Sequence, residues 1–222
     1  MGEILLTGYE PFGHTPINPA EQVANRLHGV RIGDDEIVSR IIPNVFFRCI
    51  DVVADAIEAI QPHTVVMMGE FGGRSMITVE RIAQNFNEST RYDLLDNNGT
   101  SIQGEPTVHG GPNAYYSTVP IRAMVKAMRS AGIPADISDT AGTFGCNHLM
   151  YGILHHVAVR QLPIRVGWIH LPALPEVAAL DRNLGSPSMS VENSSQGVHV
   201  ALEAIHAHQE DIDESVASAW QI

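Results

Sequence analysis

Cysteine is scarce in this sequence, whose 222 residues include only Cys49 and Cys146. Two cysteines are too few for the disulfide framework of a small secreted protein, which indicates a reducing compartment. Hydrophobic runs long enough to cross a membrane are also lacking. The first nine residues have neither the basic start nor the long apolar stretch of a signal peptide. We therefore expect a cytoplasmic protein with no membrane partner.

Basic residues are few as well. Thirteen Lys and Arg stand against 25 Asp and Glu, which gives a formal net charge of −12. This excess of negative charge repels nucleic acid, so no nucleic-acid partner is expected. The motifs GxSxG, GxxxxGK[ST], GxGxxG and CxxC are absent, which disfavours serine hydrolases, nucleotide-binding proteins and dithiol redox proteins. His206 and His208 have metal-like spacing but no neighbouring ligand, so no metal site is expected.

Short apolar runs alternate with segments of helical spacing along the whole chain. This alternation predicts a parallel sheet with helices on both faces. No linker divides the chain, so a single domain over residues 1–222 is expected. Strands are predicted at 3–7, 36–42, 64–69, 76–83, 135–138 and 164–170, and helices at 19–27, 46–60, 119–130, 146–160 and 190–208. Residues 85–112 are polar and are expected to form a long excursion over the site.

The most informative stretch is residues 139–151, DTAGTFGCNHLMY. It is rich in small residues and leads into a predicted helix, which places Cys146 at or just inside a helix N-terminus. Free N–H groups and the helix dipole lower the pKa of a thiol there, and the thiolate is a nucleophile. We expect Cys146 to attack an acyl carbon, with its own N–H holding the oxyanion. The alternative is a buried structural cysteine behind a tight turn.

A thiol nucleophile needs a base and a group that orients the base. His170 ends the last predicted strand and is the candidate base, with a structurally satisfied histidine as the alternative. In parallel sheets, ligands bind beyond the carboxyl ends of the strands, where we expect Glu70, the Cys146 loop and His170. Glu80 lies within a predicted strand, where an acid is costly unless it is paired. From the residues alone, a salt bridge between Glu80 and Arg81 or Arg74 is favoured.

Several stretches together resemble one family, type I pyroglutamyl peptidase, also called pyrrolidone-carboxylate peptidase, whose members are cysteine peptidases. The stretches are residues 6–13 with 18–19, 72–75 with 80–83, 141–151, 169–172 and 187–190. The resemblance implies an α/β fold, a single-domain α/β/α sandwich with a twisted, mostly parallel central sheet. It further implies no cofactor, a cytosolic homotetramer, and removal of an N-terminal pyroglutamyl residue from peptides through a thioester intermediate.

The resemblance also implies a catalytic triad of Cys146 as nucleophile, His170 as base and Glu80 as orienting group. For Glu80 this replaces the salt-bridge interpretation. Tyr9 and Phe12 match the aromatic residues that hold the substrate ring in the family. The substrate-binding set is expected to comprise Tyr9, Phe12, Glu70, Phe144 and Gly145.

Three departures from the family pattern stand out. Glu70 occupies a position that is usually neutral, and we expect its carboxylate to point away from the substrate. The run at residues 85–97 is longer than usual, and Arg91 is its only candidate for the arginine that bacterial members place near the oxyanion. His14 replaces a glycine after Gly13.

Two other functions share these residues. One is a catalytically inactive protein of the same fold that binds a lactam or a peptide terminus. The other is a thiol amidase with the same triad and a different pocket.

Overall fold

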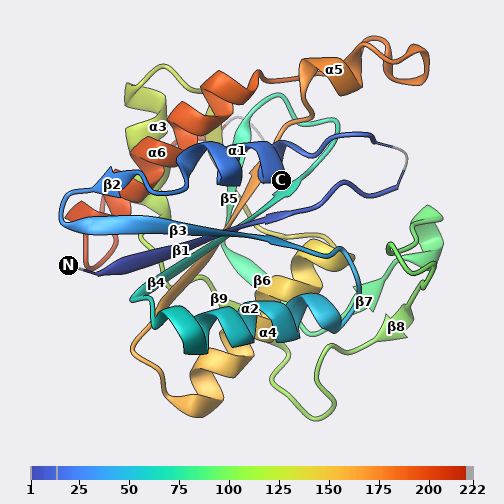
Figure 1. The fold of residues 1–222 in the computed structure, drawn as a ribbon, viewed down its shortest axis with the longest axis horizontal. Coiled ribbons are helices and arrows are strands. Elements are labelled where there is room, and N and C mark those ends of the chain that lie inside the picture. Colours follow the sequence, from blue (N-terminus) through green and yellow to red (C-terminus); the bar gives the residue numbers. More distant parts are fainter. Residues whose placement is uncertain (1, 14, 219–222) are drawn as a thin grey trace.

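A seven-stranded sheet forms the centre of the computed structural model, which describes residues 2–13 and 15–218 (Figure 1). Across the sheet the strands are β10 (Ala135–Ser138), β5 (Ile77–Glu80), β11 (Arg165–Leu171), β4 (Thr64–Glu70), β1 (Glu3–Tyr9), β3 (Asp35–Ile42) and β2 (Arg31–Ile32). The central strands β11, β4 and β1 are almost completely buried. This matches their continuous apolar sequences, which are typical of strands covered on both faces.

Strand directions confirm a mostly parallel sheet, but not the fully parallel one that the alternation predicts. Strands β3, β1, β4 and β11 are parallel, whereas β5 is antiparallel to β11 and β2 is antiparallel to β3. Strand β10 pairs in parallel with β5 and therefore runs in the direction opposite to β11. The sequence predicts that Glu70, the Cys146 loop and His170 follow strands that end at one edge of the sheet. This is correct for β4 and β11, which carry Glu70 and His170, and wrong for β10, which precedes the Cys146 loop.

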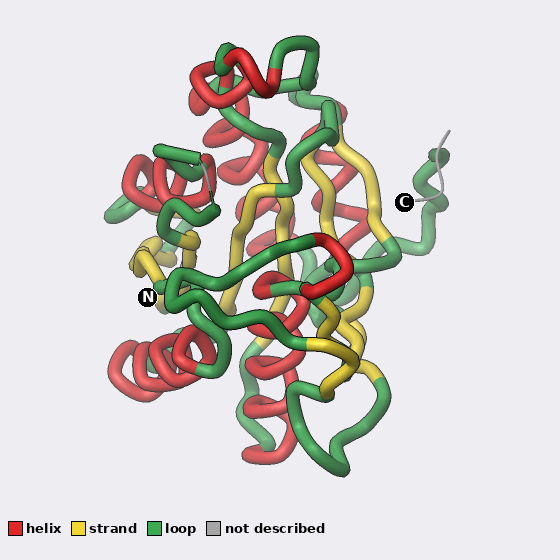
Figure 2. Tube along the Cα trace, turned by 90° about the vertical axis from the view of Figure 1, so that its right-hand side faces the viewer, coloured by secondary structure: helices red, strands yellow, loops and turns green. Residues whose placement is uncertain are grey.

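Helices cover both faces of the sheet (Figures 1 and 2). On one face lie α1 (Pro19–Leu27), α3 (Ile121–Ser130) and α6 (Val191–Ala207), and on the other lie α2 (Arg48–Ile60) and α4 (Gly145–Arg160). The Asn18 side chain caps α1 by accepting from the Ala20 N–H, and Ser190 caps α6 by accepting from the Asn193 N–H. These caps explain why the helices begin at the predicted positions.

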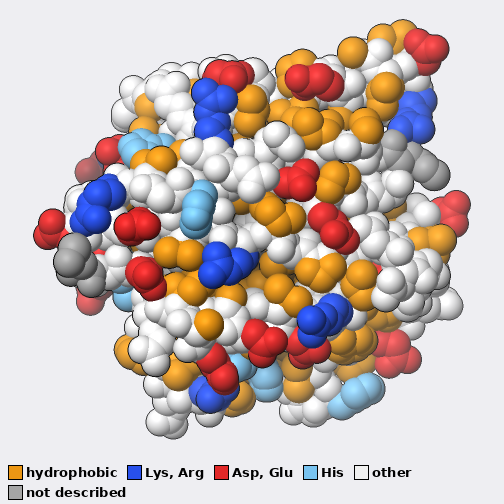
Figure 3. Space-filling view, viewed as in Figure 1, with side chains coloured by type: hydrophobic (Ala, Val, Ile, Leu, Met, Phe, Trp, Pro, Cys, Tyr) orange, Lys and Arg blue, Asp and Glu red, His pale blue; other side chains and the backbone are white. Residues whose placement is uncertain are grey.

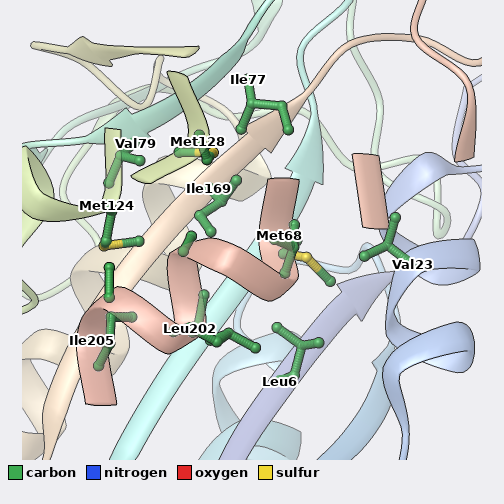
Figure 4. Close-up of a cluster of buried hydrophobic side chains, with 14 of the residues drawn as sticks. Leu6, Val23, Met68, Ile77, Val79, Met124, Met128, Ile169, Leu202 and Ile205 are labelled. Atoms are coloured by element: carbon green, nitrogen blue, oxygen red, sulfur yellow. The ribbon is translucent and has the colours of Figure 1, made fainter. Parts of the chain in front are cut away.

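Strand alternation divides the core into two layers. Leu6, Met68 and Ile169 pack under α6 against residues such as Leu202, as Figure 4 shows. Their strand neighbours Leu5, Met67 and Trp168 pack on the α2 and α4 side. Because successive strand side chains point to opposite faces, Gly69, Glu80 and His170 face α4, the helix that carries Cys146. The alternation of side chains along the strands therefore places these residues on the same face of the sheet as Cys146.

The segment predicted as one strand at 76–83 is two strands in different sheets. It breaks at Arg81, and β6 (Ile82–Gln84) pairs with β9 (Ala114–Tyr116) in a separate two-stranded sheet. Glu80 therefore ends β5 and is not in the middle of a strand. The excursion that follows contains β7 (Asn87–Glu88), η1 (Thr90–Tyr92) and β8 (Gln103–Glu105).

A short helix α5 (Pro175–Ala178) and a 3-10 turn η2 (Asp181–Asn183) precede α6 and were not predicted, because segments this short leave no periodic signal. Acidic and basic side chains are interspersed on the face seen in Figure 3. None of the helices within the described ranges is long and apolar enough to cross a membrane.

Candidate functional site

Cys146 lies in the first turn of α4, which begins at Gly145, as the sequence predicts. N–H groups in a first turn have no intrahelical partner and are free to bind an anion. Two buried contacts fix this turn. The Tyr9 hydroxyl donates to the Gly145 carbonyl at 2.8 Å, and the Asn147 amide donates to the carbonyls of Gln84 and Phe86 at 2.9 and 3.0 Å.

The thiol and the imidazole meet over Gly69 in β4. A Cβ atom placed on Gly69 would lie 2.8 Å from Cys146 Sγ and 3.6 Å from His170 Cδ2. Only a residue without a side chain leaves room for both groups at this point. The Cδ2 side of the His170 ring therefore borders the same small space as the thiol.

The opposite edge of the His170 ring is held by Glu80. His170 Nδ1 lies 2.7 Å from Glu80 Oε1, and both side chains are almost fully buried. The Nδ1–H donates to the carboxylate, which leaves His170 Nε2 as the basic nitrogen. That atom is buried and has no hydrogen-bond partner among the described residues.

The two sequence interpretations of Glu80 both describe real contacts. Glu80 Oε1 accepts from His170 and also from Arg74 Nη1 at 2.9 Å. Arg81 pairs instead with Asp139, at 2.6 Å on the exposed surface. Burial alone would raise the pKa of Glu80, but the hydrogen bond with His170 and the charge of Arg74 outweigh burial and lower it. Glu80 is therefore a carboxylate at neutral pH.

His170 and Cys146 are both neutral in this arrangement. Burial lowers the pKa of His170, and the nearby Arg74 charge lowers it further, against the opposing effect of Glu80. Burial raises the pKa of the Cys146 thiol above its ordinary value, and the carboxylates of Glu80 and Glu70 raise it further. The prediction of a lowered thiol pKa is thus wrong for the free protein, because the helix N-terminus is not the dominant influence. A neutral thiol beside a neutral imidazole favours proton transfer during attack over a preformed ion pair.

Cys49 differs from Cys146 in exposure, although burial raises the pKa of both thiols. Cys49 lies in α2 with 1% of its surface exposed. Cys146 is only half-buried. Exposure and thiolate access decide which cysteine reacts, so Cys146 is the reactive candidate.

Aromatic side chains cluster beside the start of α4. The Phe144 ring lies 6.1 Å from Phe12 and 5.4 Å edge-on from Phe46. Tyr9 lies beyond the predicted strand 3–7 but is the last residue of β1 and is 1% exposed. Its hydroxyl supports the Cys146 turn, and contact with a substrate ring stays a prediction for Tyr9 and Phe12.

Glu70 ends β4 beside the thiol. Its side chain is half-buried, and Oε2 is buried without a hydrogen-bond partner in the described part of the chain. Burial raises the pKa of Glu70 to about 7. Because its charge raises the pKa of Cys146, the carboxylate is within electrostatic reach of the thiol. Its direction relative to a bound lactam stays a prediction.

The structure does not bring Arg91 to the thiol by any contact between described residues. Arg91 lies in η1, its side chain is exposed, and its guanidinium lies 5.4 Å from the Tyr92 ring centroid. Its oxyanion role stays a prediction. His14 lies outside the described residues.

The His206 side chain contacts an acidic residue. His206 Nδ1 lies 3.0 Å from Asp35 Oδ2, and in the ranges described here no group of three or more His, Cys, Asp or Glu side chains is arranged to hold a metal ion.

Sequence reasoning missed several residues that shape the site. Trp168 and Phe71 contact the His170 ring, at centroid distances of 5.6 and 5.2 Å. Gly69 and Phe46 were placed only as parts of a strand and a helix. The signal that singles out Gly69 is a glycine near the carboxyl end of an apolar strand, where a ligand approaches the backbone closely.

Comparison with known proteins agrees with this geometry. The family model described as pyroglutamyl peptidase matches residues 2–208. A pyrrolidone-carboxylate peptidase of Mycobacterium tuberculosis is 55% identical over 222 residues, which is the full length of both chains. One from Bacillus cereus is 42% identical over 96% of this chain and 97% of its own.

Solved structures give the same result. Pyroglutamyl peptidase I from Bacillus amyloliquefaciens has a TM-score of 0.90 at 38% identity, covering 96% of this chain and all of its own. Pyrrolidone carboxyl peptidase from Thermococcus litoralis has a TM-score of 0.91 at 33% identity, covering 97% of this chain and all of its own. By sequence over nearly its whole length and by fold, this chain belongs to the pyroglutamyl peptidase family.

Proposed function

We propose that this protein is a cysteine peptidase that removes an N-terminal pyroglutamyl residue from peptides, with Cys146 as the nucleophile. One observation carries the proposal. The thiol and the His170 imidazole share the space over Gly69 while Glu80 holds Nδ1. A nucleophile, a base and an orienting carboxylate in this order are the parts that acyl transfer requires.

The reaction follows from the protonation states. As the Cys146 sulfur attacks the pyroglutamyl carbonyl carbon, its proton moves to His170 Nε2. Glu80 stabilises the imidazolium that forms, and the Cys146 N–H donates to the oxyanion. His170 then gives the proton to the departing amine as the C–N bond breaks. Water, activated by His170, hydrolyses the thioester and releases pyroglutamate.

Specificity is attributed to the aromatic wall of Phe12, Phe46 and Phe144. Pyroglutamate is an uncharged lactam, whereas an ordinary peptide begins with an ammonium group. Burying that ammonium against aromatic rings without a partner would cost several kcal/mol, so free N-termini should be rejected. The family usually has a neutral residue where Glu70 stands, and we expect backbone groups near Glu70 to bind the lactam.

The alternatives are not favoured. A binding protein has no need for the buried Glu80–His170 pair beside a thiol, and the relatives over the whole chain are named as peptidases. We further propose a single domain, a cytoplasmic location and a homotetramer. These proposals rest on the sequence resemblance and the scarcity of cysteine, and light scattering after size-exclusion chromatography tests the homotetramer.

The test is hydrolysis of a chromogenic pyroglutamyl amide before and after treatment with iodoacetamide, with the labelled cysteine located by peptide mapping. We expect hydrolysis that disappears in proportion to labelling of Cys146. Cys49→Ser is the matched control and should react and be inactivated like the wild type, because Cys49 is buried in α2. Inactivation by label on Cys49 with Cys146 unlabelled would contradict the assignment.

A further inference from the structure

Arg74 is a buried cation that the reaction described above does not use. It lies in the loop between β4 and β5, and only 11% of its side chain is exposed. Its guanidinium reaches Glu80 Oε1 at 2.9 Å, the Thr78 hydroxyl, and Ser138 Oγ at 3.4 Å. A buried guanidinium with this many partners has one well-defined position.

The hydrogen bonds of Glu80 are unequally divided between its two oxygens. Oε1 accepts from His170, Arg74 and Thr78, at 2.7, 2.9 and 3.2 Å. Oε2 is buried and has no hydrogen-bond partner among the described residues. The carboxylate is therefore fixed in orientation through one atom, and Arg74 is the only one of its three partners with a permanent charge.

Arg74 also reaches His170 by a second route. Its guanidinium carbon lies 3.7 Å from the centroid of the Phe71 ring. The Phe71 ring in turn meets the His170 ring edge-on at 5.2 Å. A cation over one aromatic face is attracted to it, so Arg74 holds Phe71 against the imidazole.

We propose that Arg74 is a positioning residue for His170, acting through Glu80 by keeping that carboxylate ionised and Oε1 aimed at Nδ1. Without the guanidinium, a fully buried carboxylate would have only the imidazole and the hydroxyls of Thr78 and Ser138 to offset its desolvation. It would take up a proton, which removes the charge that stabilises imidazolium, or rotate, which moves that charge away from Nδ1. This inference rests on the proposed peptidase function.

A double-mutant cycle between Arg74→Gln and Glu80→Gln tests the proposal. Arg74→Gln should lower kcat about 10- to 100-fold, because small errors in the position of a reacting group carry costs of that order, and should leave KM within about twofold. In the Glu80→Gln background the same change should cause no further loss, because the carboxylate through which Arg74 acts is gone. Arg81→Gln is the matched control, since Arg81 is partly exposed and pairs with Asp139 away from the imidazole. It should stay within about twofold of wild type.

A second readout does not need peptidase activity. The rate of Cys146 alkylation by iodoacetamide, measured from pH 5 to 10, reports how the thiol loses its proton. The titratable groups that act on the thiol or the imidazole are Glu80, Glu70, Cys49, Tyr9 and Arg74. Arg74→Gln should alter this profile more strongly in the wild-type background than in the Glu80→Gln background, where only the direct effect of the Arg74 charge on the thiol and the imidazole is lost. If wild type fails to hydrolyse the amide, the peptidase proposal fails while this cycle still decides the role of Arg74.

Equal losses from Arg74→Gln in both backgrounds would overturn the proposal, because they would indicate a structural role independent of Glu80. An unchanged kcat in folded Arg74→Gln would overturn it as well. Circular dichroism and thermal unfolding check the fold of each variant. Should Arg74→Gln not fold, Arg74→Lys takes its place, which keeps the charge but loses the contacts with Thr78, Ser138 and Phe71. Arg74→Lys should then keep the pH profile of alkylation close to that of wild type but have a lower kcat, and wild-type kcat would overturn the proposal.

Discussion

The carboxyl group of Glu70 should make the stability of this protein depend on pH between about 4.5 and 7. Its ordinary pKa is 4.5, and burial raises it to about 7 in the folded protein. In this range the folded state binds more protons at Glu70 than the unfolded state does, so the free energy of unfolding falls as the pH rises. The contribution of Glu70 is fully present below about pH 4.5 and is lost above about pH 7.

The magnitude follows from the shift. At about 1.4 kcal/mol for each unit of pKa, the shift from 4.5 to about 7 corresponds to at most about 3.5 kcal/mol. Glu70→Gln keeps the shape and removes the charge. The variant should therefore match the wild type at pH 4.5 and be more stable at pH 8, by at most about 3.5 kcal/mol. Because Glu70 also raises the pKa of Cys146, the variant thiol should be alkylated at lower pH than the wild type.

Urea unfolding at pH 4.5, 6 and 8 measures this difference directly. Other titrating groups act equally on both proteins, so the difference between variant and wild type isolates Glu70. Glu105→Gln is the control, because Glu105 is exposed in β8 and its change should be within about 0.5 kcal/mol at every pH. A stability difference between Glu70→Gln and wild type that is the same at pH 4.5 and pH 8 would refute the reasoning.

Three further changes test the site. Gly69→Ala should cost about 1–3 kcal/mol of stability and about 100-fold in kcat, because the added Cβ would lie 2.8 Å from Cys146 Sγ. Gly72→Ala is the control, since the nearest contact of its Cβ would be an ordinary 3.7 Å. Equal losses of stability and kcat in the two variants would contradict the close packing at Gly69. His170→Ala should abolish hydrolysis, whereas Glu80→Gln should keep a measurable residual activity, because an amide still accepts from Nδ1 but does not stabilise imidazolium. Wild-type turnover in Glu80→Gln would indicate that Glu80 has only a structural role. Tyr9→Phe should lower the free energy of unfolding by about 1 kcal/mol, because it removes the donor to the Gly145 carbonyl, and an unchanged urea midpoint would show that this bond contributes nothing.

The sequence predicts the site better than it predicts the sheet. The helix start at Cys146 follows from the change from small residues to helical periodicity, and the motifs point to His170 and Glu80. Strand direction does not follow from the alternation of elements. The antiparallel insertion of β5 beside β11 depends on contacts between residues far apart in the chain.

The protonation state of the site is also beyond the sequence. A helix N-terminus favours a thiolate, and only the fold reveals that burial and two carboxylates oppose it at Cys146. The same holds for Glu80, whose salt bridge and histidine contact looked like competing interpretations. In the structure Arg74 and His170 both donate to Glu80 Oε1, because Arg74 reaches it from the loop before β5 and His170 from β11.

The role of Cys146 as the nucleophile is tested by comparing pyroglutamyl amide hydrolysis by wild type, Cys146→Ala and Cys49→Ala at equal concentrations of folded protein. We expect hydrolysis by wild type and Cys49→Ala at rates of the same order, and none above background by Cys146→Ala. Hydrolysis of the amide by folded Cys146→Ala at a rate close to that of wild type would contradict it.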